Sequence, residues 1–401
     1  MPIEPIFKFF INDISNPVTW ESRIWKKSLP VSRNRFVKQS KTENNQDITY
    51  GDYFQAIGRF FKDDSFADLL SVMPSCPDMD IGLKNINEIS IYLIKHGALY
   101  HPSRVEFYIK NKKLQFVLNV ALSTFGRTIL LKEYNVLKKL NNNFTFSFLP
   151  IVYQYDEVYL PKIGRKETCQ KAGLLLGEWL DGFNEFHLTM DQDNQKQKII
   201  VWDSINGNYY LSTRETLELY KQAATILTCY YNIKTFEQIF PWHHAAGDFV
   251  VKKRNDKLYL KIVTARQYAS MFGRNVNSIR HETDTNSISE GLLVFFLNLS
   301  IRMRLDRLDG VGDTVWANDV AVAGTFKGFM NGLVLKPENN IFPEALDKYF
   351  KDLLLSCTKQ DIFDLLVNIV TAYDQQSSEI PIIKQNLNKH AEVLHNVIRD
   401  G

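Results

Sequence analysis

The sequence predicts an α+β fold with two lobes, in which a strand-containing N-terminal half leads into a mainly helical C-terminal half. Two patterns predict this division. Apolar and polar residues alternate between residues 104 and 122, which is typical of a β-hairpin. Beyond residue 213, apolar residues recur mostly at the three- and four-residue spacing of amphipathic helices. The length of 401 residues, 45% of them hydrophobic, is sufficient for two domains.

Three regions are expected along the chain. Residues 1–99 form an N-terminal extension with packing helices, one from about Thr49 to Leu70 and another from about Asn85 to Lys95, because their apolar residues follow helical spacing. Residues 100–178 form an N-lobe, and residues 179–401 form a mainly helical C-lobe.

The N-lobe is predicted to contain a hairpin, a helix and two further strands. Arg104–Ile109 and Leu114–Leu122 form the hairpin around a polar turn. A helix runs from about Gly126 to Leu140, because its apolar residues gather on one face. Phe148–Tyr155 and Ala172–Glu178 have strand character.

The turn residues of Trp179–Phe183 mark the boundary at which the C-lobe begins. Two short strands, Phe249–Val251 and Leu258–Val263, flank a polar turn. The remaining elements are predicted helices at about 213–231, 287–307, 315–332, 344–356, 359–373 and 380–398.

The distribution of charged residues indicates whether a nucleic acid is an expected partner. The chain has 48 basic and 45 acidic residues, a net charge of +3, and they are spread without a long basic run. Binding to a phosphate backbone requires clustered cations. We therefore expect no nucleic-acid partner.

Cysteine usage and hydropathy bear on the compartment. The four cysteines lie far apart without a Cys-x-x-Cys pair, so neither a zinc site nor a disulfide framework is predicted. The N-terminus shows no signal-peptide pattern. The longest apolar run, Gly291–Ile301, is shorter than the roughly 20 residues that a membrane helix needs. We expect a cytoplasmic protein without a membrane partner.

The segment Trp242-His-His-Ala-Ala-Gly-Asp248-Phe resembles the His-Gly-Asp loop of the protein-kinase-like fold, in the branch of small-molecule kinases such as the aminoglycoside phosphotransferases. The similarity covers roughly residues 100–335, and the order of the predicted elements agrees with it. In that family the loop aspartate orients the substrate hydroxyl or accepts its proton. The resemblance therefore implies a catalytic role for Asp248.

The resemblance also implies nucleotide-binding positions in the N-lobe. Asn119 stands where the family has a strand lysine that holds the phosphates, and an amide supplies no positive charge. Glu133 matches the helix glutamate that pairs with this lysine. A solvated helix carboxylate at Glu133 and an exposed hairpin side chain at Asn119 are the structural alternatives.

Glu178, Trp179 and Leu180 match the family's hinge, whose backbone reads the adenine edge. A plain connection between lobes is the alternative. Trp179 and Phe183 are candidates for lining a ligand pocket, because aromatic and polar residues are mixed after the hinge.

The metal-binding positions of the family are replaced in this chain. Thr264 stands where the family has a metal-binding aspartate, and Lys252-Lys253 stands where it has a metal-binding asparagine. We predict no metal-binding residue, because magnesium prefers anionic oxygens. Thr264 remains a nucleotide-binding candidate, and Arg266 is a candidate for the ligand pocket.

His244 is a further pocket candidate, although a structural role for it and for His243 is favoured over metal binding or proton transfer. The acidic group of His281–Asp284 with Glu290 has two interpretations, a replacement for a lost metal ligand or a solvated loop and helix start, and the second is favoured.

The leading hypothesis is a pseudokinase that binds a nucleotide or another small ligand between its lobes. One alternative is an active small-molecule phosphotransferase that uses Asp248. Another is a non-enzymatic protein that binds a protein partner through its helical C-lobe. The sequence leaves open whether the protein is an enzyme and which cofactor it uses, with ATP and Mg²⁺ as the candidates that the resemblance implies.

Overall fold

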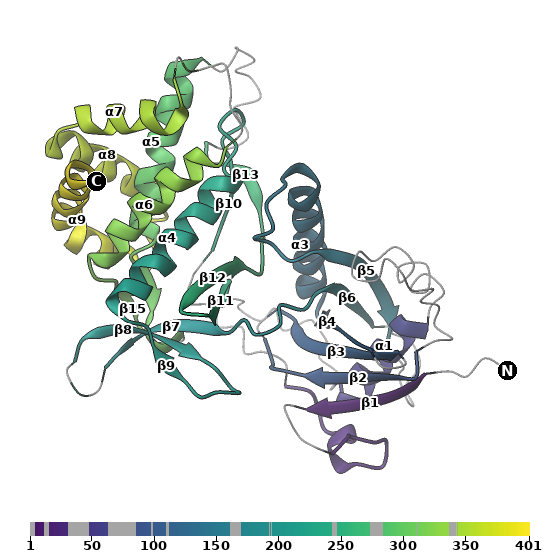
Figure 1. The fold of residues 1–401 in the computed structure, drawn as a ribbon. Helices are drawn as coiled ribbons and strands as arrows, with labels where there is room; N and C mark the ends of the chain where they lie inside the picture. Colours follow the sequence, from purple (N-terminus) through teal and green to yellow (C-terminus); the bar gives the residue numbers. More distant parts are fainter. Residues whose placement is uncertain are drawn as a thin grey trace. The chain divides into compact units, whose positions relative to one another are not determined.

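The computed structural model describes residues 5–11, 16–30, 48–62, 86–97, 99–109, 112–160, 170–191, 193, 195–242, 247–272, 284–310, 312–336, 342 and 344–401. These residues form an α+β protein, which confirms the predicted class (Figure 1). The chain divides into two compact units. Unit 1 comprises residues 1–139 and 150–180, and unit 2 comprises residues 140–149 and 181–401.

Unit 1 is built on a six-stranded sheet with the order β1-β2-β3-β4-β6-β5 (Figure 1). β1 pairs in parallel with β2, and every other pair is antiparallel. The predicted hairpin is confirmed as β3 and β4. The strands are β1 (Ile6–Ile11), β2 (Glu88–Leu93), β3 (His101–Ile109), β4 (Lys112–Ala121), β5 (Val152–Tyr159) and β6 (Lys171–Glu178).

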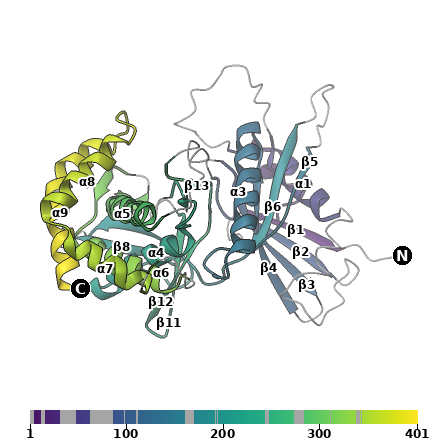
Figure 2. The same ribbon diagram turned by 90° about the horizontal axis from the view of Figure 1, so that it is seen from above.

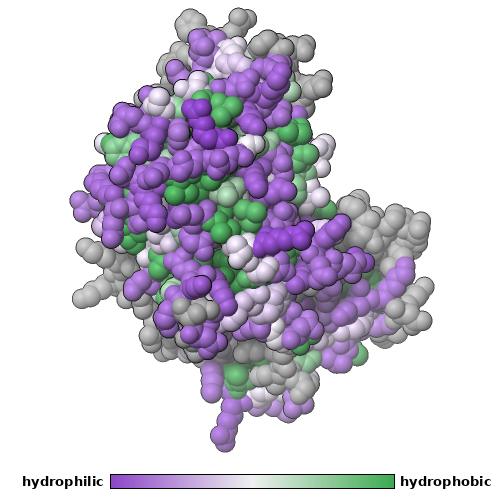
Figure 3. All heavy atoms as spheres, turned by 60° about the vertical axis from the view of Figure 1, so that its left-hand side comes forward, coloured by the Kyte–Doolittle hydropathy of each residue, from purple (hydrophilic) through white to green (hydrophobic). Residues whose placement is uncertain are grey.

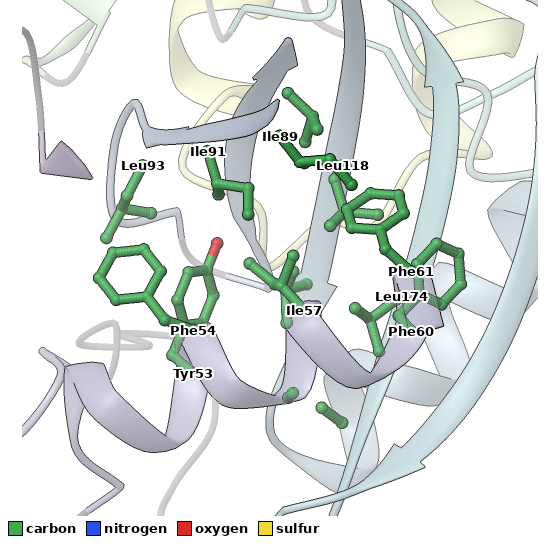
Figure 4. Packing of buried hydrophobic residues seen from close by; sticks show 14 of the residues in the cluster. Tyr53, Phe54, Ile57, Phe60, Phe61, Ile89, Ile91, Leu93, Leu118 and Leu174 are labelled. Carbon is green, nitrogen blue, oxygen red and sulfur yellow. The ribbon is translucent and has the colours of Figure 1, made fainter. Parts of the chain in front are cut away.

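The first predicted helix is confirmed as α1 (Tyr50–Lys62), which covers one face of this sheet, and residues 63–70 of the prediction lie outside the described residues. Its buried residues recur at helical spacing and pack against alternate residues of the strands (Figure 4). The labelled residues of this cluster are Tyr53, Phe54, Ile57, Phe60, Phe61, Ile89, Ile91, Leu93, Leu118 and Leu174. A short 3₁₀ helix, η1 (Arg23–Lys26), precedes α1.

The helix predicted from about Asn85 to Lys95 is wrong, because this segment contains the strand β2. Ile89, Ile91 and Leu93 alternate along it and are fully buried under α1. Their period of two fits a strand, and pairing with β1 and β3 satisfies the backbone. Residues of the 1–99 region thus supply two strands of the unit 1 sheet as well as a helix.

The predicted helix between the strands is confirmed as α3 (Thr124–Asn143). It lies on the opposite side of the sheet from α1 (Figure 2). Leu130 of α3 packs with Ala121 and Leu175, whereas the neighbouring residue Leu174 points to the α1 side. Successive strand residues face opposite sides, so each helix covers one set.

Unit 2 contains the predicted helices of the C-terminal half. α5 ends at Arg302, earlier than predicted, and α6 begins at Val320, later than predicted, because Leu305–Arg307 and Thr314–Trp316 form the antiparallel pair β14–β15. The helices are α4 (Thr213–Tyr230), α5 (Thr285–Arg302), the 3₁₀ helix η5 (Leu308–Gly310), α6 (Val320–Val334), α7 (Leu346–Ser356), α8 (Lys359–Thr371) and α9 (Ile380–Asp400).

Small sheets complete unit 2. Besides β14–β15 they are β7-β8-β9 (Glu185–Met190, Gln197–Trp202 and Tyr209–Tyr210), β10-β13 (Glu237–Ile239 and Tyr268–Ser270) and β11-β12 (Phe249–Arg254 and Lys257–Ile262). The two strands predicted in this half are confirmed as β11 and β12, with a turn of only two residues, Asn255 and Asp256. The face seen in Figure 3 is mostly hydrophilic, with apolar side chains gathered in small patches.

Helix α4 is the element against which the β11–β12 hairpin is fixed. Gln222 of α4 donates to the Leu258 carbonyl and accepts from the Leu260 amide, each over 2.8 Å. On another side, α4 packs closely against glycines of α6, where a Cβ at Gly328 would lie 2.0 Å from the carbonyl oxygen of Lys221. The hairpin therefore rests on a tightly packed support.

Candidate functional site

Asp248 lies directly before β11, after Gly247, whose φ of +77° favours glycine. The residue is 1% exposed. Its carbonyl accepts from the amide of Val263 over 2.8 Å, which joins the start of β11 to the segment after β12. The loop that resembles the kinase motif thus ends with a buried carboxylate at a fixed position.

The side chain of Asp248 is held by Arg266. The guanidinium donates from Nη1 to Oδ2 over 2.9 Å and from Nη2 to Oδ1 over 2.7 Å. This is a bidentate, charge-assisted pair, the strongest geometry for an arginine and a carboxylate. The two residues were predicted separately as catalytic and pocket candidates, and the structure brings them together.

Thr264 is buried in the segment between β12 and Arg266, at the position where the family that the sequence resembles has a metal-binding aspartate. It is 6% exposed, and its hydroxyl has no hydrogen-bond partner among the described residues. A neutral hydroxyl does not replace an anionic ligand for magnesium. In the described ranges, no group of three or more His, Cys, Asp or Glu side chains is arranged to hold a metal ion.

Lys252 and Lys253 lie inside β11, so the position of the family's metal-binding asparagine falls within a strand. Lys252 donates to the Asp181 carbonyl over 2.7 Å, and Lys253 forms a 2.7 Å ion pair with Glu215 at the start of α4. Burial alone would raise the pKa of Glu215, but Lys253 and the hydrogen bonds from Ser212 lower it to about 2. Both lysines therefore fix the hairpin.

Phe183 lies beside the same hairpin. Lys252 Nζ is 5.8 Å and Lys261 Nζ is 6.0 Å from the centroid of its ring, within the range of cation–π attraction. The turn before it contains Gly182 with a φ of +72°, and a Cβ there would lie 2.9 Å from Lys252 Nζ. The ring is half-buried and held between two ammonium groups.

In unit 1, Asn119 and Glu133 lie on the α3 side of the sheet. Asn119 pairs with Leu175, and Glu133 belongs to the buried stripe of α3. Glu133 is 2% exposed, and the hydroxyl of Tyr100 donates to its Oε2 over 3.1 Å. The alternative interpretation of Glu133 as a solvated carboxylate is therefore wrong.

The hinge candidates belong to the same unit. Glu178 exchanges hydrogen bonds with Ile151, because its amide donates to the Ile151 carbonyl over 2.8 Å and its Oε2 accepts from the Ile151 amide over 3.1 Å. The guanidinium of Arg104 lies 5.8 Å from the centroid of the Trp179 ring. Leu180 is the last residue of unit 1. The two hydrogen bonds with Ile151 therefore anchor the end of β6 at Glu178.

The predicted site residues thus fall into two groups. Unit 1 contains Asn119, Glu133, Glu178, Trp179 and Leu180, and unit 2 contains Phe183, Asp248, Thr264 and Arg266. His244 lies outside the described residues. The helix start predicted at Asp284 is confirmed, because its side chain caps α5 by accepting from the Ser287 amide over 2.7 Å.

Asp306 is one of the buried carboxylates of unit 2 that sequence reasoning missed. Asp306 of β14 is 3% exposed, and its Oδ1 accepts from the amide of Arg307. Burial raises the pKa of Asp306 to about 7, against the opposing effect of its backbone hydrogen bonds. The sequence predicted a helix at about 287–307, which placed Asp306 near the end of that helix. No local pattern indicated a buried strand.

The sequence matches no protein-family model. It is 28% identical over 105 residues to the sodium-dependent nutrient amino acid transporter 1 of Drosophila melanogaster, and 27% identical over 107 residues to that of Drosophila simulans. The matched segment is 26% of this chain in both cases, and it spans only 16% and 17% of the transporters. Among the residues described, no helix is long and apolar enough to cross a membrane.

Among solved structures, the chain is similar to the BubR1 kinase domain, with a TM-score of 0.29 and 11% sequence identity. The similarity covers 85% of this chain and 98% of that domain.

Proposed function

We propose that this protein is a pseudokinase, a kinase-like protein whose phosphotransfer motifs are degenerate and which binds a nucleotide or another small ligand without transferring phosphate. The order of elements supports this. A hairpin, β3–β4, leads through α3 into the two strands β5 and β6, and a helical unit with an aspartate loop follows. This order agrees with the resemblance drawn from the sequence.

The observation that carries the proposal is the bidentate pair of Asp248 and Arg266. A catalytic aspartate must present an oxygen to the substrate hydroxyl. Both carboxylate oxygens of Asp248 already accept from the guanidinium, and the side chain is 2% exposed. Asp248 therefore serves to fix the segment after β12, and it does not act as a base.

The residues at the other positions where the chain departs from the family also support a protein that does not transfer phosphate. Phosphoryl transfer depends on positive charge near the phosphates and on bound metal ions. Asn119 supplies no charge, and Thr264 supplies no carboxylate. Glu133 accepts from a tyrosine hydroxyl, which is a structural hydrogen bond in a buried place. Ligand binding needs fewer of these groups than transfer does, because it does not require stabilisation of a transition state.

The test combines binding and turnover on the full chain. Thermal unfolding is measured with ATP and ADP, each with Mg²⁺ and with EDTA, and phosphate release is measured alongside. We expect a nucleotide at about 100 times its Kd to stabilise the protein by about 2.7 kcal/mol. Phosphate release is expected to be equal for the wild type and Asp248→Asn.

Either of two results would contradict one part of the proposal. Turnover that disappears in Asp248→Asn would favour the active phosphotransferase. If no nucleotide or phosphorylated ligand tested changes the melting temperature, the proposed ligand binding is contradicted.

A further inference from the structure

The β11–β12 hairpin presents one strongly basic face. In its antiparallel register, Lys252 pairs with Tyr259 and Arg254 pairs with Lys257. Side chains two residues apart on a strand, and those directly opposite across the pair, lie on the same face. The outer face therefore carries Val250, Lys252, Arg254, Lys257, Tyr259 and Lys261.

The opposite face of the hairpin is buried and fixes its orientation. Phe249, Val251 and Ile262 are fully buried, and Leu258 and Leu260 are nearly so. Gln222 of α4 binds the backbone of β12, and Glu215 of α4 pairs with Lys253. The basic face is thus displayed on a rigid support.

The charge of the hairpin is unusual for this chain. Residues 249–262 contain five basic residues and one acidic residue, a formal charge of +4, whereas the whole chain has +3. Lys253 points to the inner face and is neutralised by Glu215. The acidic residue, Asp256, lies in the turn at the tip. The outer face carries four basic side chains, Lys252, Arg254, Lys257 and Lys261.

Aromatic groups hold part of this surface in place. The Phe183 ring keeps the ammonium groups of Lys252 and Lys261 within 6.0 Å of its centroid, and Lys252 also donates to the Asp181 carbonyl. Arg254 and Lys257 near the tip are exposed. Tyr259 is 48% exposed between the two pairs of cations.

We propose that this basic face, defined by Lys252, Arg254, Lys257 and Lys261, docks an extended acidic segment of a partner protein. A six-residue strand is about 20 Å long, and carboxylates on alternate residues of an extended peptide are about 7 Å apart, the same spacing as cations on alternate residues of β11. Charge complementarity would steer such a segment onto the face.

Other polyanions fit this surface less well. Single-stranded nucleic acid relies on stacking bases on open aromatic faces, but Phe183 is half-buried between two lysines and only Tyr259 is open on this face. A membrane surface would gain little from insertion, because the aliphatic residue of the face, Val250, is buried. The docking function is independent of the proposed nucleotide binding.

The experiment measures binding of a fluorescein-labelled hexaglutamate peptide to the full chain by fluorescence anisotropy. The test variant is Arg254→Glu/Lys257→Glu, in which both residues are exposed at the hairpin tip. The control, Lys359→Glu/Lys389→Glu, makes the same charge change at exposed positions of α8 and α9. Circular dichroism and the melting temperature confirm that both variants fold.

We expect the tip variant to weaken peptide binding by about tenfold or more, because two attractions become repulsions, and the control by less than about twofold. Binding should also weaken as salt rises from about 50 to about 200 mM. Equal losses in both variants would overturn the proposal in favour of non-specific charge attraction. Tighter, tip-dependent binding of oligodeoxythymidylate or of phosphatidylserine vesicles than of the peptide would assign the face to those ligands instead.

Discussion

Replacing Arg266 by alanine should destabilise the protein strongly, because it leaves the carboxylate of Asp248 buried without its bidentate partner. Removing one member of a buried ion pair costs about 3–5 kcal/mol. The Asp248 side chain is 2% exposed, but that of Arg266 is 31% exposed, so water can partly replace the guanidinium. We therefore expect a loss of about 2–3 kcal/mol in the free energy of unfolding.

A double-mutant cycle separates this pair from other effects of the substitution. In Asp248→Asn/Arg266→Ala the buried charge is gone, so the double variant should lose less than the sum of the single variants, by at least about 1.5 kcal/mol. Urea unfolding, followed by tryptophan fluorescence and circular dichroism, measures each free energy. Arg214→Ala, at an exposed position of α4, is the matched control and should change stability by less than about 0.5 kcal/mol.

Additive free energies in this cycle, with a coupling below about 0.5 kcal/mol, would refute the reasoning. They would mean that Asp248 and Arg266 do not depend on each other. The carboxylate of Asp248 would then be available to a substrate, and the pseudokinase proposal would lose the observation that carries it.

Three further predictions concern stability. Gly328→Ala should cost about 3 kcal/mol or more in urea unfolding, because its Cβ would meet a backbone carbonyl at 2.0 Å, whereas Gly58→Ala, with open space around it, should gain about 0.5–1 kcal/mol. Because burial raises the pKa of Asp306 to about 7, the folded state retains a proton there that the unfolded state has lost above about pH 4. Stability should therefore fall as pH rises from 4 to 7, and Asp306→Asn should flatten this slope in unfolding curves measured across that range. Thr358→Ala removes a capping box from α8 and should lower the free energy of unfolding by about 1 kcal/mol, and with it the melting temperature. An unchanged melting temperature would contradict a stabilising role of this cap.

The helices of the C-terminal half were predictable because their signal is local. The predicted ranges of α4, α8 and α9 agree with the structure to within about two residues, since periodic apolar residues and caps such as Thr358 mark them. The strand β2 was mistaken for a helix because Ile89, Ile91 and Leu93 alternate over only six residues, and so short an alternation is a weak signal within the longer segment. Its state is decided by pairing with β1, about 80 positions away in the sequence.

The sequence by itself determined which chemical groups are present, namely an asparagine at residue 119, a threonine at 264 and an aspartate at 248. The asparagine supplies no positive charge and the threonine supplies no carboxylate, wherever these residues lie. Only the tertiary structure decided that Arg266 occupies both oxygens of Asp248, and that the register of β11 and β12 gathers four cations on one face. A side chain's chemistry is local, whereas its partner depends on strand pairing and burial, which arise from residues far apart in the chain.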